Sequence, residues 1–169
     1  MHAAKNGNVN ALGGAPFGYV YMKANQGQNA YYKIHPIEAE IVRECYDLYC
    51  NKQISIGAIG RLFKEKGYIT RTGKTSWACP VIWGMLQNPA YKGEAAFRKT
   101  IMVEREKITK KAREGSLYPK LAKSSCRQRP KEDRITIPVP KIIDSSLFDR
   151  AEERLKENKK FSPRNTAHP

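Results

Sequence analysis

The stretch PIEAEIVRECYDLYC, residues 36–50, shows the clearest structural pattern in the chain. Pro36 suits the first position of a helix, because its missing N–H would have no partner there. Glu38 and Glu40 fall in the first turn, where the helix dipole favours negative charge. Apolar side chains recur at helical spacing and predict one amphipathic helix over 36–50 with a solvated acidic face. These apolar residues are Ile37, Ile41, Val42, Cys45, Leu48 and Tyr49.

Two further helices are predicted after this one. Ser55 is a good N-cap and Gly67 a good terminator, which indicates a helix over 55–66. Pro80 suits the start of a helix and Asn88-Pro89 would end it, which indicates a further helix over 79–87. The two resemble a helix-turn-helix pair, but a standard turn has roughly 3–4 residues and this connection is about three times longer. An elaborated helix-turn-helix and two unrelated core helices are equally compatible with the spacing. Residues expected to face inward from 79–87 are Val81, Ile82, Met85 and Leu86.

The flanking segments predict a small β component. Residues 17–22 and 30–34 read as the strands of a hairpin around a polar turn at 24–29. Gly93–Val103 is compatible with a strand, and the prolines in 135–140 favour extended chain. Asp144 can cap a last helix over 145–160. We therefore expect an α+β fold, mainly helical, with a small β-hairpin or sheet and the helix-turn-helix-like pair.

Charge and composition suggest five segments. Residues 1–15 read as a flexible lead-in, 16–103 as a DNA-binding domain and 104–134 as a basic arm or loop. Residues 135–161 are expected to be an extended segment and a C-terminal helix that packs on the domain, and 162–169 a tail. Residues 98–134 hold thirteen basic and five acidic side chains, whereas 36–60 hold two and four. The acidic segment is thus expected to face away from a polyanion.

The net charge of +15 makes nucleic acid the leading class of partner. No apolar run is long enough to span a bilayer and no secretion signal stands at the start, so we expect a cytoplasmic protein without a membrane partner. The four cysteines include no C-x-x-C pair and the three histidines are scattered, so neither a metal site nor another cofactor is expected. We find no arrangement typical of a catalytic centre.

The connection before residue 79 has the composition of a phosphate-binding surface. It places hydroxyls and cations just before a helix N-terminus, where backbone N–H groups also attract anions. An ordinary solvated loop is the alternative, and Arg71 could instead read a guanine edge. Trp77 and Trp83 are expected in the core, as are the hairpin aromatics Phe17, Tyr19, Tyr21, Tyr31 and Tyr32. The first candidates for DNA contact are Thr70, Arg71, Thr72, Lys74 and Ser76, and the second are Arg61, Lys64, Lys92, Arg98 and Lys99.

Several stretches, in order, resemble the recombinase domain of the large serine recombinases, the family of phage integrases and mobile-element transposases. The most specific is Met85–Gly93 (MLQNPAYKG), preceded by Trp77. The resemblance covers roughly residues 13–100 and 135–165. The other matching stretches are Gly14–Tyr19 (GAPFGY), His35–Val42 (HPIEAEIV), Ile54–Ile59 (ISIGAI), Gly67–Ile69 (GYI), Ile137–Pro140 (IPVP) and Ile143–Phe148 (IDSSLF).

The resemblance implies site-specific binding of duplex DNA at one half of an attachment site, within a recombinase that integrates or excises a mobile element. It implies partner subunits in a dimer or tetramer, and a lead-in at 5–15 along the minor groove. The serine nucleophile and zinc ribbon of such proteins are not expected in this chain, so the piece itself is not expected to be an enzyme. Two departures weaken individual contacts: Cys79 stands where a hydroxyl cap is usual, and Gln87 where a basic residue is common.

Two other functions fit the composition. The aromatic hairpin beside basic residues is compatible with a basic RNA-binding module. The chain could also serve mainly to position recombinase subunits, with its charge contributing only solubility. The first alternative predicts a preference for single-stranded RNA, and the second predicts self-association with negligible DNA affinity.

Overall fold

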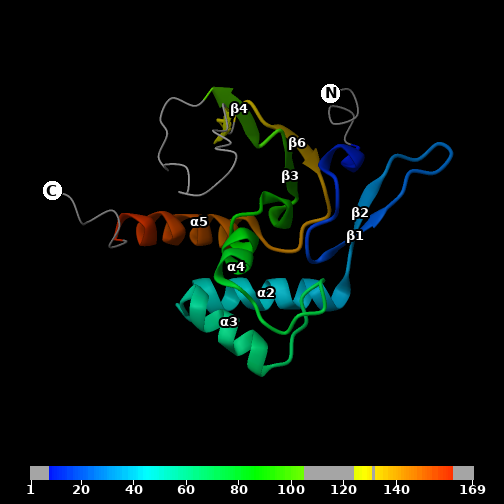
Figure 1. Cartoon of the computed structure of the whole chain (residues 1–169). Coiled ribbons are helices and arrows are strands. Elements are labelled where there is room, and N and C mark those ends of the chain that lie inside the picture. The colour runs from blue at the N-terminus through cyan, green and yellow to red at the C-terminus, as the bar shows by residue number, and fades with distance from the viewer. Residues whose placement is uncertain (1–7, 105–123, 131, 162–169) are drawn as a thin grey trace, which may run out of the picture.

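The computed structural model describes residues 8–104, 124–130 and 132–161. The described residues contain four α-helices, with three two-stranded antiparallel sheets and short 3₁₀ turns, so the expected α+β class is confirmed (Figure 1). The helices are α2 (Pro36–Cys50), α3 (Ile56–Glu65), α4 (Cys79–Leu86) and α5 (Ser145–Lys160), and the 3₁₀ turns are η1 (Val9–Leu12) and η2 (Pro89–Lys92). The strands are β1 (Tyr19–Met22), β2 (Tyr31–Ile34), β3 (Glu94–Phe97), β4 (Thr100–Glu104), β5 (Ser124–Gln128) and β6 (Ile135–Pro138).

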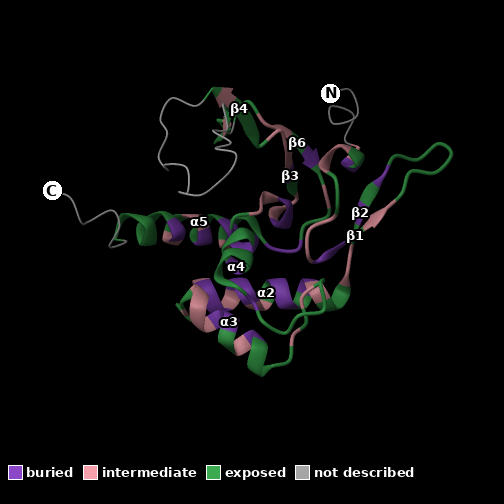
Figure 2. Cartoon of the chain, viewed as in Figure 1, coloured by how far each residue is buried: buried purple, intermediate pink, exposed green. Residues whose placement is uncertain are grey.

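Helix α2 lies at the centre of the core, and its buried face follows the predicted stripe (Figure 2). Val42, Cys45 and Tyr46 are fully buried, and burial raises the pKa of the Cys45 thiol to about 12. The Tyr46 hydroxyl donates to the Met85 carbonyl oxygen at 3.0 Å, and its ring stacks on Phe148 of α5. Helix α2 therefore packs against both α4 and α5. Ile37 is the exception to the predicted stripe, since it is 68% exposed.

The helix boundaries agree closely with the sequence pattern because the capping signals are local. Ser55 accepts a hydrogen bond from the Ala58 N–H at 3.3 Å, and Gly67 ends that helix with φ 71°. Asp144 stands at the N-cap position of α5 as predicted, but its side chain makes no capping bond. Instead its carboxylate accepts from Lys141 Nζ at 3.3 Å. This nearby cation offers the carboxylate an alternative partner.

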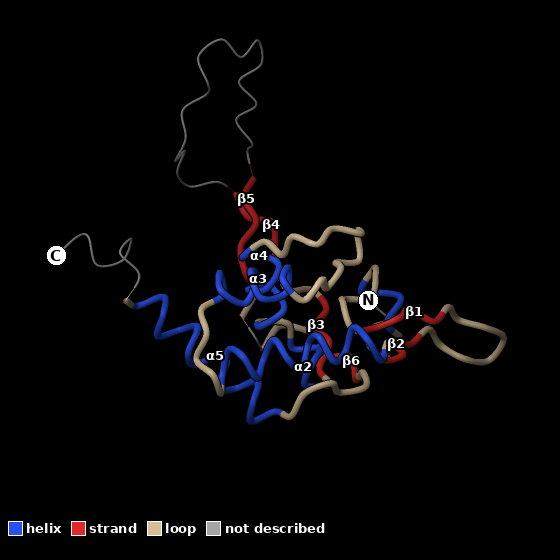
Figure 3. Tube along the Cα trace, turned by 90° about the horizontal axis from the view of Figure 1, so that it is seen from below, coloured by secondary structure: helices blue, strands red, loops and turns tan. Residues whose placement is uncertain are grey.

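The predicted hairpin is confirmed, and it projects from the body at the end opposite the last turns of α5 (Figure 3). Residues 8–15, expected to belong to a flexible lead-in, contact the rest of the domain. Val9 is 1% exposed, and its N–H donates to the Ala30 carbonyl oxygen at 3.3 Å. A buried apolar side chain thus holds η1 against the hairpin. Residues 1–7 and the predicted tail at 162–169 lie outside the described residues.

The described residues between 94 and 138 form two pairs of strands, where the sequence predicted one strand and an arm. β3 pairs with β6, and β4 pairs with β5, both antiparallel. Sequence reasoning assigned 124–128 to a basic arm and did not predict β5, because its residues SSCRQ lack a β pattern and owe their strand to the register with β4. Positions 105–123 and 131 of the predicted arm lie outside the described residues.

Gly60 sets the distance between α3 and the chain that leads into α4. A Cβ atom on Gly60 would lie 2.6 Å from the Trp77 carbonyl oxygen. We expect Gly60→Ala to lower the free energy of unfolding by about 1–3 kcal/mol in urea titrations, since the backbone must shift. Gly57→Ala, in the same helix, is the control, because its Cβ would meet nothing closer than 3.9 Å. Equal stability of the two variants would contradict this packing argument.

Candidate nucleic-acid interface

The connection between α3 and α4 contains a hydrogen-bonded turn at residues 70–74. The Thr70 N–H donates to the Lys74 carbonyl oxygen and the Gly73 N–H to the Thr70 carbonyl oxygen, both at 2.8 Å. The Thr70 hydroxyl also lies 3.0 Å from both the backbone nitrogen and the carbonyl oxygen of Lys74. Thr70, a predicted DNA contact, therefore closes this turn with its own side chain.

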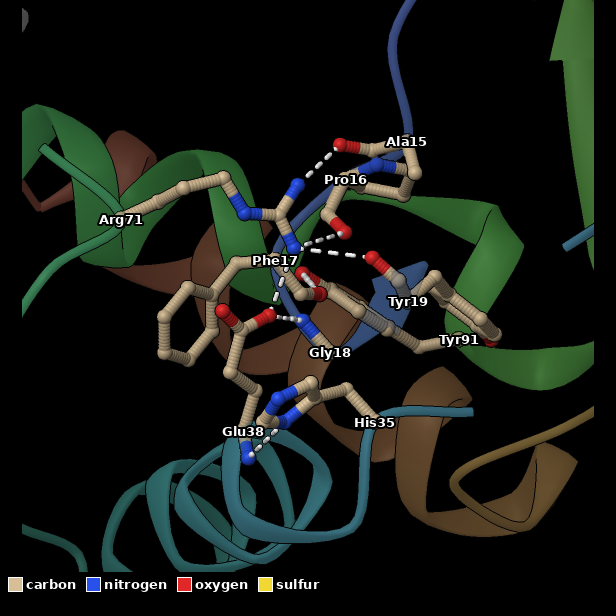
Figure 4. A network of polar contacts seen from close by, with 9 residues as sticks. All are labelled: Ala15, Pro16, Phe17, Gly18, Tyr19, His35, Glu38, Arg71 and Tyr91. Atoms are coloured by element: carbon tan, nitrogen blue, oxygen red, sulfur yellow. Dashed lines mark hydrogen bonds and ion pairs between the residues drawn. The ribbon is translucent and has the colours of Figure 1, made fainter. Parts of the chain in front are cut away.

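Arg71 fastens the turn to the N-terminal part of the domain (Figure 4). Its guanidinium donates to the carbonyl oxygens of Ala15, Pro16 and Tyr19, the last at 2.8 Å. It also pairs with the Glu38 carboxylate at 2.6 Å, and the same oxygen accepts from the Gly18 N–H at 2.7 Å. Both terminal nitrogens of the leading sequence-predicted DNA contact thus bind the protein's own chain.

The start of the connection is fastened to α2 in a similar way. The Glu44 carboxylate pairs with Lys66 and accepts from the Tyr68 hydroxyl at 2.6 Å. Desolvation raises the Glu44 pKa, but the hydrogen bonds from Lys66 and Tyr68 and the charge of Lys66 outweigh it and lower the pKa overall. Glu38 and Glu44 were predicted on a solvated face, which is wrong: they are 18% and 24% exposed and hold the connection.

The lowered pKa makes part of the stability depend on pH. A carboxylate with a lowered folded-state pKa stabilises the fold above its ordinary pKa and loses this contribution as the pH falls through the folded value. We expect the stability advantage of the unaltered chain over Glu44→Gln to shrink as the pH is lowered through that range. Urea titrations at a series of pH values measure the difference. An advantage that does not change with pH would contradict the role given to this carboxylate.

Three exposed cations remain on α3 and on the connection that follows it. The side chains of Arg61, Lys64 and Lys74 make no hydrogen bond or ion pair within the described parts of the chain. Thr72 and Ser76 are exposed beside them in the sequence. Cations without acidic partners, next to hydroxyl groups, form a surface suited to phosphate oxygens. We call these five residues the connection surface.

Helix α4 presents an apolar surface. Trp83 and Val81 are 49% and 47% exposed, so the expectation that both belong to the core is wrong. The helix is too short to bury more than one face, and Ile82, Met85 and Leu86 occupy it. The first residue, Cys79, follows an N-cap, Ala78, that makes no side-chain capping bond. Trp77 is in the core as predicted, 5% exposed, with its indole N–H on the Tyr68 carbonyl oxygen at 3.0 Å.

The other second-rank candidates lie elsewhere. Lys92 is 23% exposed, pairs with Glu94 at 3.0 Å and lies over the Phe148 ring at 5.3 Å, so its charge is used inside the fold. Arg98 and Lys99 form the turn between β3 and β4, which Figure 1 shows at the opposite end of the view from α3. The sequence candidates therefore do not form one cluster.

Sequence reasoning missed the acidic residues that hold the connection. Glu38 and Glu44 carry a helical signal, but nothing local indicates partners more than twenty positions away. Within the described residues, no cluster of histidine, cysteine and acidic side chains could hold a metal ion. None of the helices in that part of the chain combines the length and apolar character needed to cross a bilayer.

Comparisons with known proteins give consistent results. Residues 36–158 match the profile of the family described as Recombinase. The chain is 27% identical over 159 residues to a protein of Bacillus subtilis (strain 168) named "Putative DNA recombinase", covering 88% of this chain and 29% of that protein. It thus spans less than a third of this relative's length.

Two solved structures are similar in fold, each at 18% sequence identity over 98% of this chain. The first is a crystal structure of an LSR–DNA complex, with a TM-score of 0.58 over 38% of that chain. The second comes from work on the sequence requirements of the Listeria innocua prophage attP site, with a TM-score of 0.55 over 55% of that chain. At this identity the likeness concerns the fold alone.

Proposed function

Because the chain belongs to the Recombinase family, that of the large serine recombinases, we propose that it binds duplex DNA as one part of a site-specific recombinase. The whole protein would integrate or excise a mobile element and act as a dimer or tetramer on the DNA of a bacterial cytoplasm. We assign no catalytic step to the described residues. Their role in this proposal is to hold one half of an attachment site.

The connection surface is the observation that carries the proposal. Its three cations have no acidic partner in the described part of the chain, although the chain holds sixteen acidic residues. Neighbouring cations, Lys66 and Arg71, are both neutralised by acids of α2. Lys74 lies on the fastened turn, and Arg61 and Lys64 lie on helix α3. Unneutralised cations on such ordered backbone can approach phosphates without a large loss of backbone freedom. We therefore assign phosphate contact to Arg61, Lys64 and Lys74, with Ser76 adding a hydroxyl donor. The Thr72 hydroxyl lies 3.2 Å from that of Thr70 and would exchange this bond for one to a phosphate.

The alternatives differ in how well the geometry supports them. The RNA-binding alternative needs several accessible aromatic rings on which bases can stack. Tyr19 and Tyr32 are buried, at 1% and 2% exposed, so Tyr31, at 41% exposed, has neither of these rings beside it as a second stacking surface. The subunit-positioning alternative is favoured by one observation, the exposed pair of Val81 and Trp83 on α4. This apolar surface can accompany DNA binding, so we keep it as a second function.

Fluorescence-anisotropy titrations against duplex DNA and matched single-stranded RNA, at several salt concentrations, test the proposal. We expect preference for the duplex and a log–log salt dependence of several units, at about 0.9 per neutralised phosphate. Absence of duplex binding at low salt would overturn the proposal. Concentration-dependent self-association without DNA binding would instead support the subunit-positioning function.

A further inference from the structure

A second group of cations gathers at the base of the β4–β5 ribbon. Arg98 and Lys99 form the turn before β4, while Arg129 and Arg134 follow β5. The Arg129 N–H donates to the Lys99 carbonyl oxygen at 2.9 Å. The Arg134 guanidinium donates twice to the Arg129 carbonyl oxygen, at 2.7 and 3.1 Å. We call these four residues the basic corner.

The basic corner is unfavourable for the isolated fold in two ways. Arg98 has φ 57°, a left-handed conformation that side chains other than glycine and asparagine adopt at a cost. Lys99 is exposed overall, yet the pKa of its ammonium group is lowered. Desolvation of the ammonium is the larger cause, and the positive charge of Arg134 is the smaller one. Like charges therefore meet where the backbone is already strained.

One polar atom at this corner also lacks a partner. Arg129 Nε is buried and makes no hydrogen bond within the described residues. A buried donor of a charged group without an acceptor is costly, and such groups mark places where a ligand or ion can bind. Strain, like charge and an unsatisfied donor in one place together indicate an anionic ligand.

There is room for such a ligand beside the turn. An open cavity of about 410 Å³ is bounded on one side by Arg98, Lys99 and Thr100. Gly14, Pro16 and Asn88 line it from other segments. The cavity is partly open to solvent, as a site for one group of a long polymer requires.

We propose that the basic corner binds a backbone phosphate of duplex DNA, as a second contact separate from the connection surface. The inference rests on the proposed function, because a polyanion that reaches the connection surface can place further phosphates along the same molecule. A phosphodiester oxygen brings negative charge to a place where the charges of Lys99 and Arg134 repel one another, and it can accept from the Lys99 ammonium. The strained turn keeps Arg98 and Lys99 in the wall of the cavity before DNA binds.

The double variant Arg98→Gly with Lys99→Gln tests this site. Glycine accepts the left-handed φ, so the turn can keep its shape while two charges are removed. We expect the salt dependence of duplex binding to fall by about 0.9 units, the value for one neutralised phosphate. The urea midpoint should stay the same or rise. A lower midpoint with an unchanged salt dependence would overturn the proposal in favour of a structural role.

The control is Lys156→Gln with Lys160→Gln on α5, which removes the same charge from a different part of the molecule. If the salt dependence of duplex binding fell equally in the control and test variants, the proposal would also be overturned, because the effect would then come from net charge alone. Inorganic phosphate is titrated without DNA as a further arm. Saturable phosphate binding that the double variant abolishes, together with unchanged duplex binding, would assign the corner to a free anion and overturn the DNA contact.

The outcomes also separate this inference from the proposed function. No duplex binding by the unaltered chain overturns both. If the connection-surface variant described in the Discussion flattens the salt dependence and the basic-corner variant does not, only this inference is overturned. Ethylation interference adds a direct readout, since the two variants are expected to lose sensitivity at different phosphates.

Discussion

Replacing Arg61, Lys64 and Lys74 together by glutamine is expected to lower the salt dependence of duplex binding by about 2.7 units, at about 0.9 per phosphate contact. The affinity at low salt should fall steeply, because three contacts are lost from one surface. The urea midpoint should hardly change, since these side chains have no partners within the described part of the chain. Anisotropy titrations at a series of salt concentrations measure the effect.

A matched variant removes the same charge elsewhere. Lys141, Lys156 and Lys160 lie on or just before α5, and their replacement by glutamine also lowers the net charge by three. We expect a much smaller change in salt dependence, because long-range charge effects are screened at moderate ionic strength. If this variant loses as much binding as the first, the connection surface is not the contact and the proposal of specific cations fails.

Arg71→Ala is expected to destabilise the fold rather than to remove a DNA contact. The change leaves the Glu38 carboxylate without its cation and the carbonyl oxygens of Ala15 and Tyr19 without the guanidinium donor. The Pro16 carbonyl oxygen loses the same donor but keeps its bond from the Tyr19 N–H. Because Arg71 is 44% exposed, solvent screens part of this loss, and we expect the free energy of unfolding to fall by about 1–3 kcal/mol. Arg71→Lys should rescue little, because one ammonium cannot replace the planar guanidinium across these acceptors. Urea titrations measure both.

Lys74→Ala is the natural comparison for Arg71, three residues along the same turn. We expect it to reduce the salt dependence of binding by about 0.9 units with little loss of stability. The reverse result, an Arg71→Ala chain with unchanged stability and a flatter salt dependence, would return Arg71 to the role of a DNA contact. The two variants therefore separate fastening of the turn from contact with its ligand.

The helices and their ends could be predicted from the sequence, because their signals are local. The stripe in 36–50, the Ser55 cap and the Gly67 stop act within a few residues, so physics at short range determines them. Arg61, Lys64 and Lys74 could be proposed as DNA contacts for the same reason. Their charge, and their places between the apolar positions of the pattern, can be seen in the sequence itself. The hairpin at 17–34 likewise follows from two short strands around a polar turn.

Only the tertiary structure decided which side chains are free to contact a ligand. Arg71 and Thr70 look like Lys74 in the sequence, but Glu38 lies 33 positions from Arg71 and reaches it through the fold. Trp83 carries the same apolar signal as Trp77, yet only one face of the short helix α4 can be buried. β5 becomes a strand through its pairing with β4, whose partner residues lie 20 to 28 positions away. Partners brought together by the fold, and the limited area of the core, leave no trace in local sequence.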